Sequence, residues 1–322
     1  MAAIPNPRGR SVAGPAIASP PTAPQSTFQL RIVMSDTVTL PSSSANMPPS
    51  GNGKRSGNVP RSGNACRLTN SLPVPRPGFR RLEPTPELLD HLRAESQRLE
   101  SATPEEIIAW GVENYAPYFT MATAFGPEGC VILAMLAQIA PQTYTFNLET
   151  GYQFRETLEL RDRIAEKFGI EVDLLEPELT VAEYELLHDG PLYQTNPDRC
   201  CFDRKIRTLE RAAQVMHAWM SGIRRDQSPD RARAAIVGWD KKFGLVKISP
   251  LANWTKKDVW KRITDEGIPY NPLLDQGFPS IGCWPCTRAV ADGETDDRAG
   301  RWSGTKKTEC GLHTAEQDGS GI

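Results

Sequence analysis

Residues Tyr118–Phe125 read YFTMATAF, an apolar run that stops at a glycine and is typical of a buried strand. Downstream, Gly129–Gln138 predicts a buried helix, Thr143–Asn147 (TYTFN) a second strand, Gln153–Phe168 a helix and Ile170–Leu175 a third strand. Strands that alternate with helices at this spacing pair in parallel, because each helix carries the chain back across the sheet. The sequence therefore predicts an α/β fold with helices on both faces of a parallel sheet.

The pattern continues on both sides of this core. Upstream, Thr85 and Thr103 each precede a proline and then a helical run, which is a helix start signal. After Gly300 there are few apolar anchors, so residues 301–322 are expected to form a mobile C-terminal segment. Four further elements are predicted downstream of the core: a helix at 201–214, strands at 217–222 and 246–248, and a helix at 255–265.

Residues 1–78 have a different composition. They hold 13 of the 28 prolines, with many Ser, Gly and Asn, and show no periodicity. Such a segment buries too little apolar surface to offset the entropy of ordering it, so we predict a disordered extension and an α/β domain at 79–300. The extension is either dispensable or, being Ser-rich, basic and acid-poor, an organelle transit peptide. The first reading is favoured, because no Arg-bearing amphipathic helix is visible.

Charge and hydropathy exclude several classes of partner. Residues 1–70 contribute +6 to a total of −2, so the remainder carries −8. A domain that acidic is a poor ligand for nucleic acid, and a basic cluster inside it is expected to serve a small anion. No apolar run approaches the ~20 residues of a membrane span, so no membrane partner is expected. No secretory signal is visible either, and we expect a cytoplasmic protein, or a plastid one if the extension is a transit peptide.

Three loops are expected at the carboxyl edge of the sheet, where parallel sheets bind ligands. One is the turn Ala124–Gly129 and another is Leu148–Thr157; taken alone, each is read as an ordinary loop. The third, Ser221–Ser228, places Arg224 and Arg225 after a strand. Paired arginines suit a phosphate or sulfate, although a solvated charge run is an equal alternative.

Four of the seven cysteines form two groups, Cys200-Cys201 and Cys283-x-x-Cys286. The CxxC spacing lets two thiolates reach one metal centre. Structural zinc usually uses two such pairs, and adjacent cysteines fit it poorly. A thioredoxin-like redox pair is the other alternative, but no βαβ start precedes it. The spacing favours an iron–sulfur centre over zinc.

Cys310 stands apart in a polar tail. Lys306, Lys307 and His313 surround it in the sequence, and nearby cations lower the pKa of a thiol. This predicts a reactive cysteine, with an incidental surface cysteine as the alternative. Cys130 lies in the apolar helix and is expected to be core packing.

Taken in chain order, these segments resemble the assimilatory adenylyl-sulfate (APS) reductases, within the phosphoadenylyl-sulfate reductase family. The resemblance covers roughly Pro104–His313. The segments that carry it are CCxxRK from Cys200, GIRRDQS from Gly222, WTKKDVW from Trp254, PYNPL from Pro269, GFPSIGCWPCT from Gly277, RAGRW from Arg298 and KKTECGLH from Lys306.

The resemblance implies a Rossmann-like, adenine nucleotide α-hydrolase-like fold and an oxidoreductase that converts APS to sulfite and AMP in sulfate assimilation. It implies a [4Fe–4S] cluster on the four grouped cysteines, with an electrostatic and structural role rather than electron relay. The same cysteine set implies APS rather than its 3′-phosphorylated analogue. Plant-type members add a C-terminal redoxin domain; the chain stops nine residues past His313, so an external thioredoxin is expected as electron donor.

Residue roles follow from the same resemblance. The Cys310 thiolate attacks the sulfur of APS and forms an S-sulfocysteine, with His313 and Lys205 as further catalytic residues. Metal ligands are Cys200, Cys201, Cys283 and Cys286. Substrate-binding residues are Thr123, Phe125, Gly126, Thr150, Gly151, Lys205, Arg224, Arg225, Arg298 and Arg301.

Three other functions are compatible with parts of the pattern. One is a reductase for 3′-phosphoadenylyl sulfate, and another is a zinc-stabilised nucleotide-binding module without catalysis. A tRNA thiolase of the ATP pyrophosphatase type is the third, but it requires an SGGxDS-like loop, which this sequence lacks.

Overall fold

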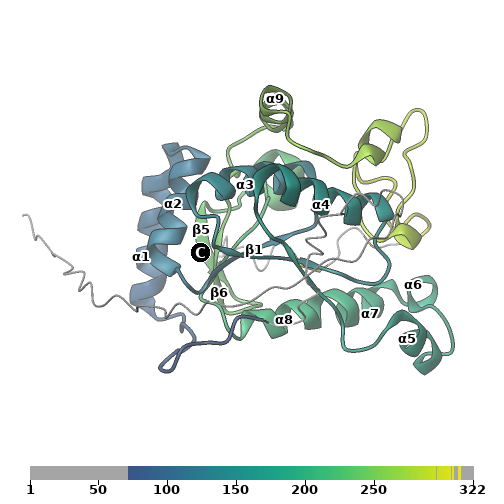
Figure 1. The fold of residues 1–322 in the computed structure, drawn as a ribbon, viewed down its shortest axis with the longest axis horizontal. Coiled ribbons are helices and arrows are strands. Elements are labelled where there is room, and N and C mark those ends of the chain that lie inside the picture. The colour runs from purple at the N-terminus through teal and green to yellow at the C-terminus, as the bar shows by residue number, and fades with distance from the viewer. Residues whose placement is uncertain (1–71, 295, 306, 308–310, 313–322) are drawn as a thin grey trace, which may run out of the picture. The chain divides into compact units, whose positions relative to one another are not determined.

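The computed structural model describes residues 72–294, 296–305, 307 and 311–312 (Figure 1). The helices in this part of the chain are α1 (Pro86–Arg98), α2 (Pro104–Tyr115), α3 (Pro127–Ile139), α4 (Arg155–Phe168), α5 (Val181–Leu187), α6 (Leu192–Thr195), α7 (Pro197–Cys201), α8 (Arg207–Ala213) and α9 (Lys256–Glu266). The strands are β1 (Phe119–Thr123), β2 (Tyr144–Leu148), β3 (Asp173–Leu175), β4 (Ala218–Met220), β5 (Val237–Asp240) and β6 (Leu245–Ile248). Among these helices none has both the length and the apolar character to cross a membrane.

The six strands form one sheet in the order β3-β2-β1-β4-β6-β5. All neighbours pair in parallel except β5 and β6, which are antiparallel. The order reverses direction at β1, with β2 on one side and β4 on the other. In parallel sheets a crevice opens at such a switch point, beyond the carboxyl ends of the strands.

Side-chain alternation along the strands builds two cores. In β4, Ala218 and Met220 face the larger core, whereas Trp219 faces the smaller one. The larger core packs the sheet against α1, α2, α3, α4 and α9, and the smaller one packs it against α8. Figure 1 shows α3, α4 and α9 above the sheet and α8 below it. The predicted sheet covered by helices on both faces is therefore confirmed.

Local sequence signals explain where most helices start and stop. Thr103, Thr180 and Thr255 cap α2, α5 and α9 with reciprocal capping boxes, in which the Thr hydroxyl and the third-residue carboxylate satisfy backbone N–H groups. Gly169 and Gly267 end α4 and α9 in the left-handed conformation that glycine adopts without strain. The starts predicted at Thr85 and Thr103 are confirmed.

Several details differ from the sequence prediction. The helix expected at 201–214 is three pieces: α7, a π-helical turn over Phe202–Ile206, and α8. Strand β5 and helices α5 and α6 were not predicted. The last residues of the predicted extension contact the fold, since Leu72 packs on the smaller core and the Arg76 N–H donates to the Tyr118 hydroxyl over 3.2 Å.

Candidate active site

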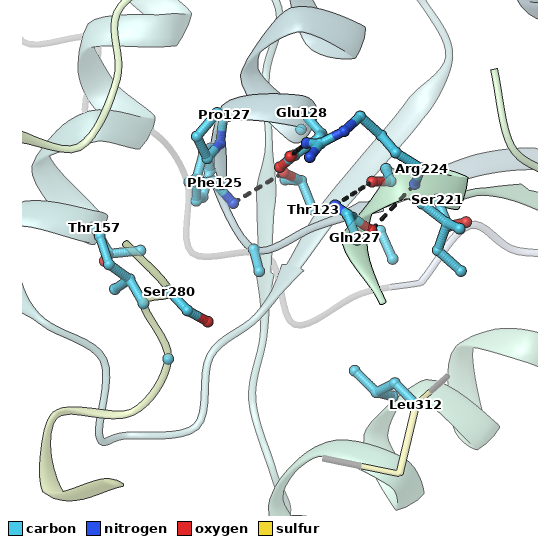
Figure 2. Close-up of a pocket in the computed structure, with 18 of the residues that line it drawn as sticks. Thr123, Phe125, Pro127, Glu128, Thr157, Ser221, Arg224, Gln227, Ser280 and Leu312 are labelled. Atoms are coloured by element: carbon cyan, nitrogen blue, oxygen red, sulfur yellow. Dashed lines mark hydrogen bonds and ion pairs between the residues drawn. The ribbon is translucent and has the colours of Figure 1, made fainter. Parts of the chain in front are cut away.

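A cavity of about 530 Å³ opens at the carboxyl ends of β1, β2 and β4 (Figure 2). Its size falls in the ~300–1,000 Å³ range of small-molecule sites. Its walls come from the turn after β1, the loop after β2, the loop after β4, and the segment that carries the CxxC pair. Figure 2 shows Thr123, Glu128 and Arg224 gathered on one side, with Ser280 and Leu312 reaching the cavity from other segments.

The turn between β1 and α3 is held by its own side chains. Thr123 is buried, and its hydroxyl accepts a 3.0 Å hydrogen bond from the Phe125 N–H. Phe125 has φ of 54°, a left-handed conformation that is strained for an aromatic residue. Gly129 has no room for a side chain, since a Cβ would lie 2.6 Å from the Thr123 hydroxyl. The predicted pocket residues Thr123, Phe125 and Gly126 all line the cavity.

The adjacent arginines Arg224 and Arg225 point to different places. Arg224 lines the cavity, is buried, and forms an ion pair with Glu128 and a 2.8 Å ion pair with Asp226. Two carboxylates thus face the Arg224 guanidinium and balance its charge. Arg225 donates instead to the Ala234 carbonyl and pairs with Glu100, outside the residues that line the cavity.

The part of the cavity that adjoins the cysteines is basic. Lys205 and Arg301 line it beside Cys283, and Arg298 lines the larger cavity as well. Arg298 and Arg301 flank the Trp302 ring at 5.8 and 4.3 Å from its centroid, and Lys307 lies 5.5 Å from the same ring. Trp302 is buried, and its role is missed by sequence reasoning although it lies within the RAGRW motif.

The loop after β2 joins the cavity to the cysteines. Thr150 lines the cavity, and its hydroxyl lies 3.3 Å from the Cys283 sulfur. Gly151 has φ of 76°, and a Cβ there would collide with Val181 and Arg204. Gly151 therefore shapes the loop rather than lining the cavity.

Arg204 fixes this loop from behind. It is buried, donates from Nε to the Thr150 carbonyl and from Nη1 to the Leu179 carbonyl, and stacks between Tyr152 and Tyr184. Arg204 follows the cysteine pair of α7 within the π-helical turn. One buried cation thus ties the pocket loop to the cysteine-bearing helix.

The four grouped cysteines converge on a second, smaller cavity. Cys200, Cys201, Cys283 and Cys286 all line it, and none of them is in a disulfide. Burial first, and then the charges of the other three thiols, raise the pKa of Cys200 to about 12. Sulfurs from positions 80 residues apart in the chain therefore lie close enough to influence one another.

The four cysteines can be compared with the metal centre that they are expected to bind. The described His, Cys, Asp and Glu side chains form no group of three or more that could hold a metal ion as they are placed. One zinc bound at ~2.3 Å to each thiolate draws the sulfurs to within about 4 Å of one another. A cluster of four irons binds each thiolate at a separate corner, which needs wider spacing. Four thiols that line one cavity and form no disulfide provide the four ligands that such a cluster needs.

The two cavities share a wall. Thr150, Lys205, Cys283 and Arg301 line both of them. Lys205 and Arg301 also oppose the upward shift in the pKa of Cys286, whose first cause is burial. Cations at the basic end of the larger cavity therefore act on the thiol group as well.

The C-terminal residues are described in part. Leu312 lines the cavity and packs on the smaller core, and the Gly311 carbonyl accepts a hydrogen bond from Lys242 Nζ. Cys310 and His313, the predicted nucleophile and its neighbour, lie outside the described residues. Glu128 and Asp226 are further cavity residues that the sequence did not identify. Asp226 stands two residues from Arg224, which is too common a pattern to single it out, and Glu128 is far from its partner Arg224 in the sequence.

The comparisons of this sequence with protein families and with curated proteins point to one family. The family model described as Phosphoadenosine phosphosulfate reductase domain matches residues 118–289. A phosphoadenosine 5′-phosphosulfate reductase of Gloeobacter violaceus is 45% identical over 70% of this chain and 93% of its own. An adenosine 5′-phosphosulfate reductase of Salinibacter ruber is 42% identical over 71% and 91%.

A solved structure agrees with these sequences. The phosphoadenylyl-sulfate reductase of Candida auris, a phosphate complex, is similar with a TM-score of 0.56 and 29% identity, over 65% of this chain and 99% of that one. The fold, the cavity at its switch point and the matched segments lead to a single assignment. The chain belongs to the phosphoadenosine phosphosulfate reductase family.

Proposed function

We propose that this chain reduces adenosine 5′-phosphosulfate to sulfite and AMP, in the assimilation of sulfate. The observation that carries the proposal is the shared wall: a nucleotide-sized cavity whose basic end is also the wall of a four-thiol cavity. A second observation is that relatives named adenosine 5′-phosphosulfate reductase match across most of their own length.

The chemistry begins with the Cys310 thiolate. Its electron pair forms a bond to the sulfur of the substrate, and the bond between that sulfur and the bridging oxygen breaks, leaving its electron pair on AMP. The product is an S-sulfocysteine on the enzyme. A thiolate of a dithiol donor then attacks the Cys310 sulfur, sulfite leaves with the electron pair, and the second donor thiol resolves the mixed disulfide. The donor dithiol is thus oxidised and the sulfuryl group reduced.

The charge distribution in the cavity orients the substrate. Negative charge develops on the sulfuryl oxygens and on the departing phosphate, and preorganised cations stabilise it. Lys205 and Arg301 supply those cations at the wall shared with the thiols, and Arg298 supplies another within the larger cavity. Arg224 is neutralised by Glu128 and Asp226, so its end of the cavity suits the uncharged nucleoside.

A [4Fe–4S] cluster on Cys200, Cys201, Cys283 and Cys286 completes the proposal. The support is four thiols that line one cavity and form no disulfide, with the Thr150 hydroxyl at 3.3 Å from the Cys283 sulfur. When bound, the cluster would add to the electrostatic field at the shared wall and hold the two cysteine segments together. His313 follows Cys310 closely enough to favour its thiolate form.

Two parts of the proposal concern the cell. Thioredoxin is the proposed donor, because the second step needs a dithiol that can reach an enzyme-bound sulfur. A cytoplasmic site of action fits a reducing compartment in which free thiols persist. The 3′-phosphorylated nucleotide is the second candidate substrate, since one relative is named a phosphoadenosine 5′-phosphosulfate reductase.

One experiment tests the reaction, the cofactor and the substrate together. The protein is purified without oxygen, assayed for iron and sulfide, and given each nucleotide with thioredoxin. We expect bound iron and sulfide, and sulfite release much faster from adenosine 5′-phosphosulfate than from the 3′-phosphorylated form. Cys310→Ser should abolish sulfite release and retain the iron. A protein that binds one zinc, or a Cys310→Ser variant with full activity, would exclude the mechanism.

A further inference from the structure

A hydrogen bond crosses the wall that the two cavities share. The Thr150 hydroxyl lies 3.3 Å from the Cys283 sulfur and accepts a 3.2 Å hydrogen bond from the Tyr152 N–H. A hydroxyl carries one proton and accepts through its lone pairs. Because the Tyr152 N–H already donates to this oxygen, the hydroxyl proton is available for the Cys283 sulfur. Thr150 is therefore a hydrogen-bond donor to one of the four proposed metal ligands.

The main chain of Thr150 is held from the other cysteine group. Arg204 donates from Nε to the Thr150 carbonyl, and it lies in the π-helical turn that directly follows Cys201. The neighbouring Gly151 makes room for this contact, since a Cβ there would lie 3.0 Å from Arg204 Nη2. Arg204 thus connects the helix of the first cysteine pair to the hydroxyl that meets the second pair.

The guanidinium of Arg204 is itself fixed on several sides. It is buried, donates from Nη1 to the Leu179 carbonyl over 3.2 Å, and lies against the rings of Tyr152 and Tyr184, at 5.4 and 5.1 Å from their centroids. The hydroxyls of both rings donate to carboxylates of α5 and the π-helical turn, over 2.8 and 3.0 Å. A planar fork reaches two carbonyls while its face meets a ring, which a lysine ammonium cannot reproduce.

We propose that Arg204 is a positioning residue that sets the Thr150 hydroxyl on the Cys283 sulfur and acts on the metal centre through that hydrogen bond. The inference rests on the proposed metal centre. A hydrogen bond to a ligating atom orients it and offsets part of its charge, and loss of such a contact typically weakens metal binding about 10- to 100-fold. Arg204 and Thr150 therefore couple the first cysteine pair to the second at the wall shared with the larger cavity.

Three variants test this coupling. Arg204→Lys keeps the charge and loses the fork, Thr150→Val loses the hydroxyl, and the third variant combines the two. Arg211→Lys is the matched control, because Arg211 also donates to a backbone carbonyl, that of Glu176 over 2.7 Å, and lines neither cavity. Each protein is purified without oxygen, and the release of its iron to a chelator is timed.

We expect iron release to be about tenfold faster in Arg204→Lys and in Thr150→Val than in the unchanged protein or Arg211→Lys. Both substitutions remove the same hydrogen bond, so the combined variant should release iron no faster than the faster single one. Thr150→Ser, which keeps a hydroxyl, should restore slow release relative to Thr150→Val. Unchanged release in Arg204→Lys, or increases that multiply in the combined variant, overturn the inference.

Urea unfolding of each variant separates this role from a general loss of stability, because only a role through Thr150 makes the two substitutions non-additive in iron release. If Arg204→Lys does not fold, Tyr184→Leu takes its place: it removes one ring from the guanidinium, and should speed iron release without adding to Thr150→Val. Additive effects of Tyr184→Leu and Thr150→Val count against the inference in the same way.

The outcomes also separate this inference from the proposed function. If the unchanged protein holds iron and sulfide but releases no sulfite from either nucleotide, the proposed reaction fails, while the comparison of iron release still decides the role of Arg204. If it holds zinc, the proposed cluster fails, and zinc release from the same variants decides the role. A protein that binds neither metal overturns both.

Discussion

Replacement of Gly282 by alanine should remove Arg301 from the site without unfolding the protein. An added Cβ would lie 2.5 Å from the Arg301 Cζ and closer still to Nη2. Gly282 does not have a positive φ, so alanine fits its backbone. The collision is with the far end of a flexible side chain, which can swing away. We therefore expect the guanidinium to leave the wall that the two cavities share.

The size of the effect follows from what Arg301 contributes there. A hydrogen bond from a charged donor to an anion is worth about 1.5–3 kcal/mol, which corresponds to about 10- to 150-fold in kcat/KM. The fold loses the stacking of Arg301 on Trp302, at 4.3 Å from the ring centroid, worth about 0.5–1 kcal/mol, and the long 3.4 Å hydrogen bond from Arg301 Nη1 to the Ser280 hydroxyl. Catalysis should therefore fall much more than stability does.

The assay is kcat/KM for sulfite release, with urea unfolding as the measure of stability. Gly238→Ala is the matched control, because its Cβ would meet only Ala235 at an ordinary 3.5 Å. If the reasoning is right, Arg301→Ala causes a similar loss, and adding Gly282→Ala to it costs little more. Full activity in Gly282→Ala, or losses that multiply in the double variant, would refute it.

Four further outcomes are expected. Iodoacetamide should leave Cys130 unmodified at pH 8 until the protein unfolds, because burial raises the pKa of this thiol to about 12. Its contribution to stability is present below pH 9 and is lost as the pH rises through 12, so Cys130→Ala should flatten the fall in unfolding free energy over that window. Arg224→Ala should lower the free energy of unfolding by about 3 kcal/mol in urea titrations, since Glu128 loses its buried partner. Cys283→Ser should lower the iron bound after anaerobic purification, whereas Cys130→Ser should not.

Local patterns predicted most of the fold. The predicted strands and helices from Phe119 to Leu175 are confirmed. They could be predicted because the signals for them, apolar runs and the glycines that end them, lie within each element or next to it. Strand β5 was missed: Val237–Asp240 is four residues long, contains a glycine and becomes a strand only by pairing with β6. The break of the 201–214 helix was missed as well, because a π-helical turn has no distinct sequence signal.

For the candidate site, the cysteine groups were predicted correctly as lying together, whereas the two adjacent arginines were not told apart. Each cysteine group is a local pattern in the sequence. Assigning all four cysteines to one metal centre predicted that the two groups lie together in the fold. Arg224 and Arg225 carry the same signal, yet one lines the cavity and the other pairs with Glu100 behind it. Adjacent residues in an extended loop point in opposite directions, so a dipeptide motif cannot say which of its members faces the ligand.

Contacts with the backbone were beyond the reach of the sequence. Lys242 reads as a solvated charge in a turn, and a carbonyl acceptor such as that of Gly311 leaves no residue-type signature. Arg204 poses the same problem, because its side chain donates to two backbone carbonyls, those of Thr150 and Leu179. A contact between two side chains can be suspected from the two residue types, such as an acid and a base. A contact with a backbone carbonyl cannot, because every residue type has that carbonyl. In this site, contacts of side chains with backbone carbonyls join the cysteine-bearing helix to the loop after β2, through Arg204, and the β5–β6 turn to Gly311, through Lys242. Substitution of Arg204 or Lys242 therefore tests how the site is held together without changing the proposed substrate-binding residues.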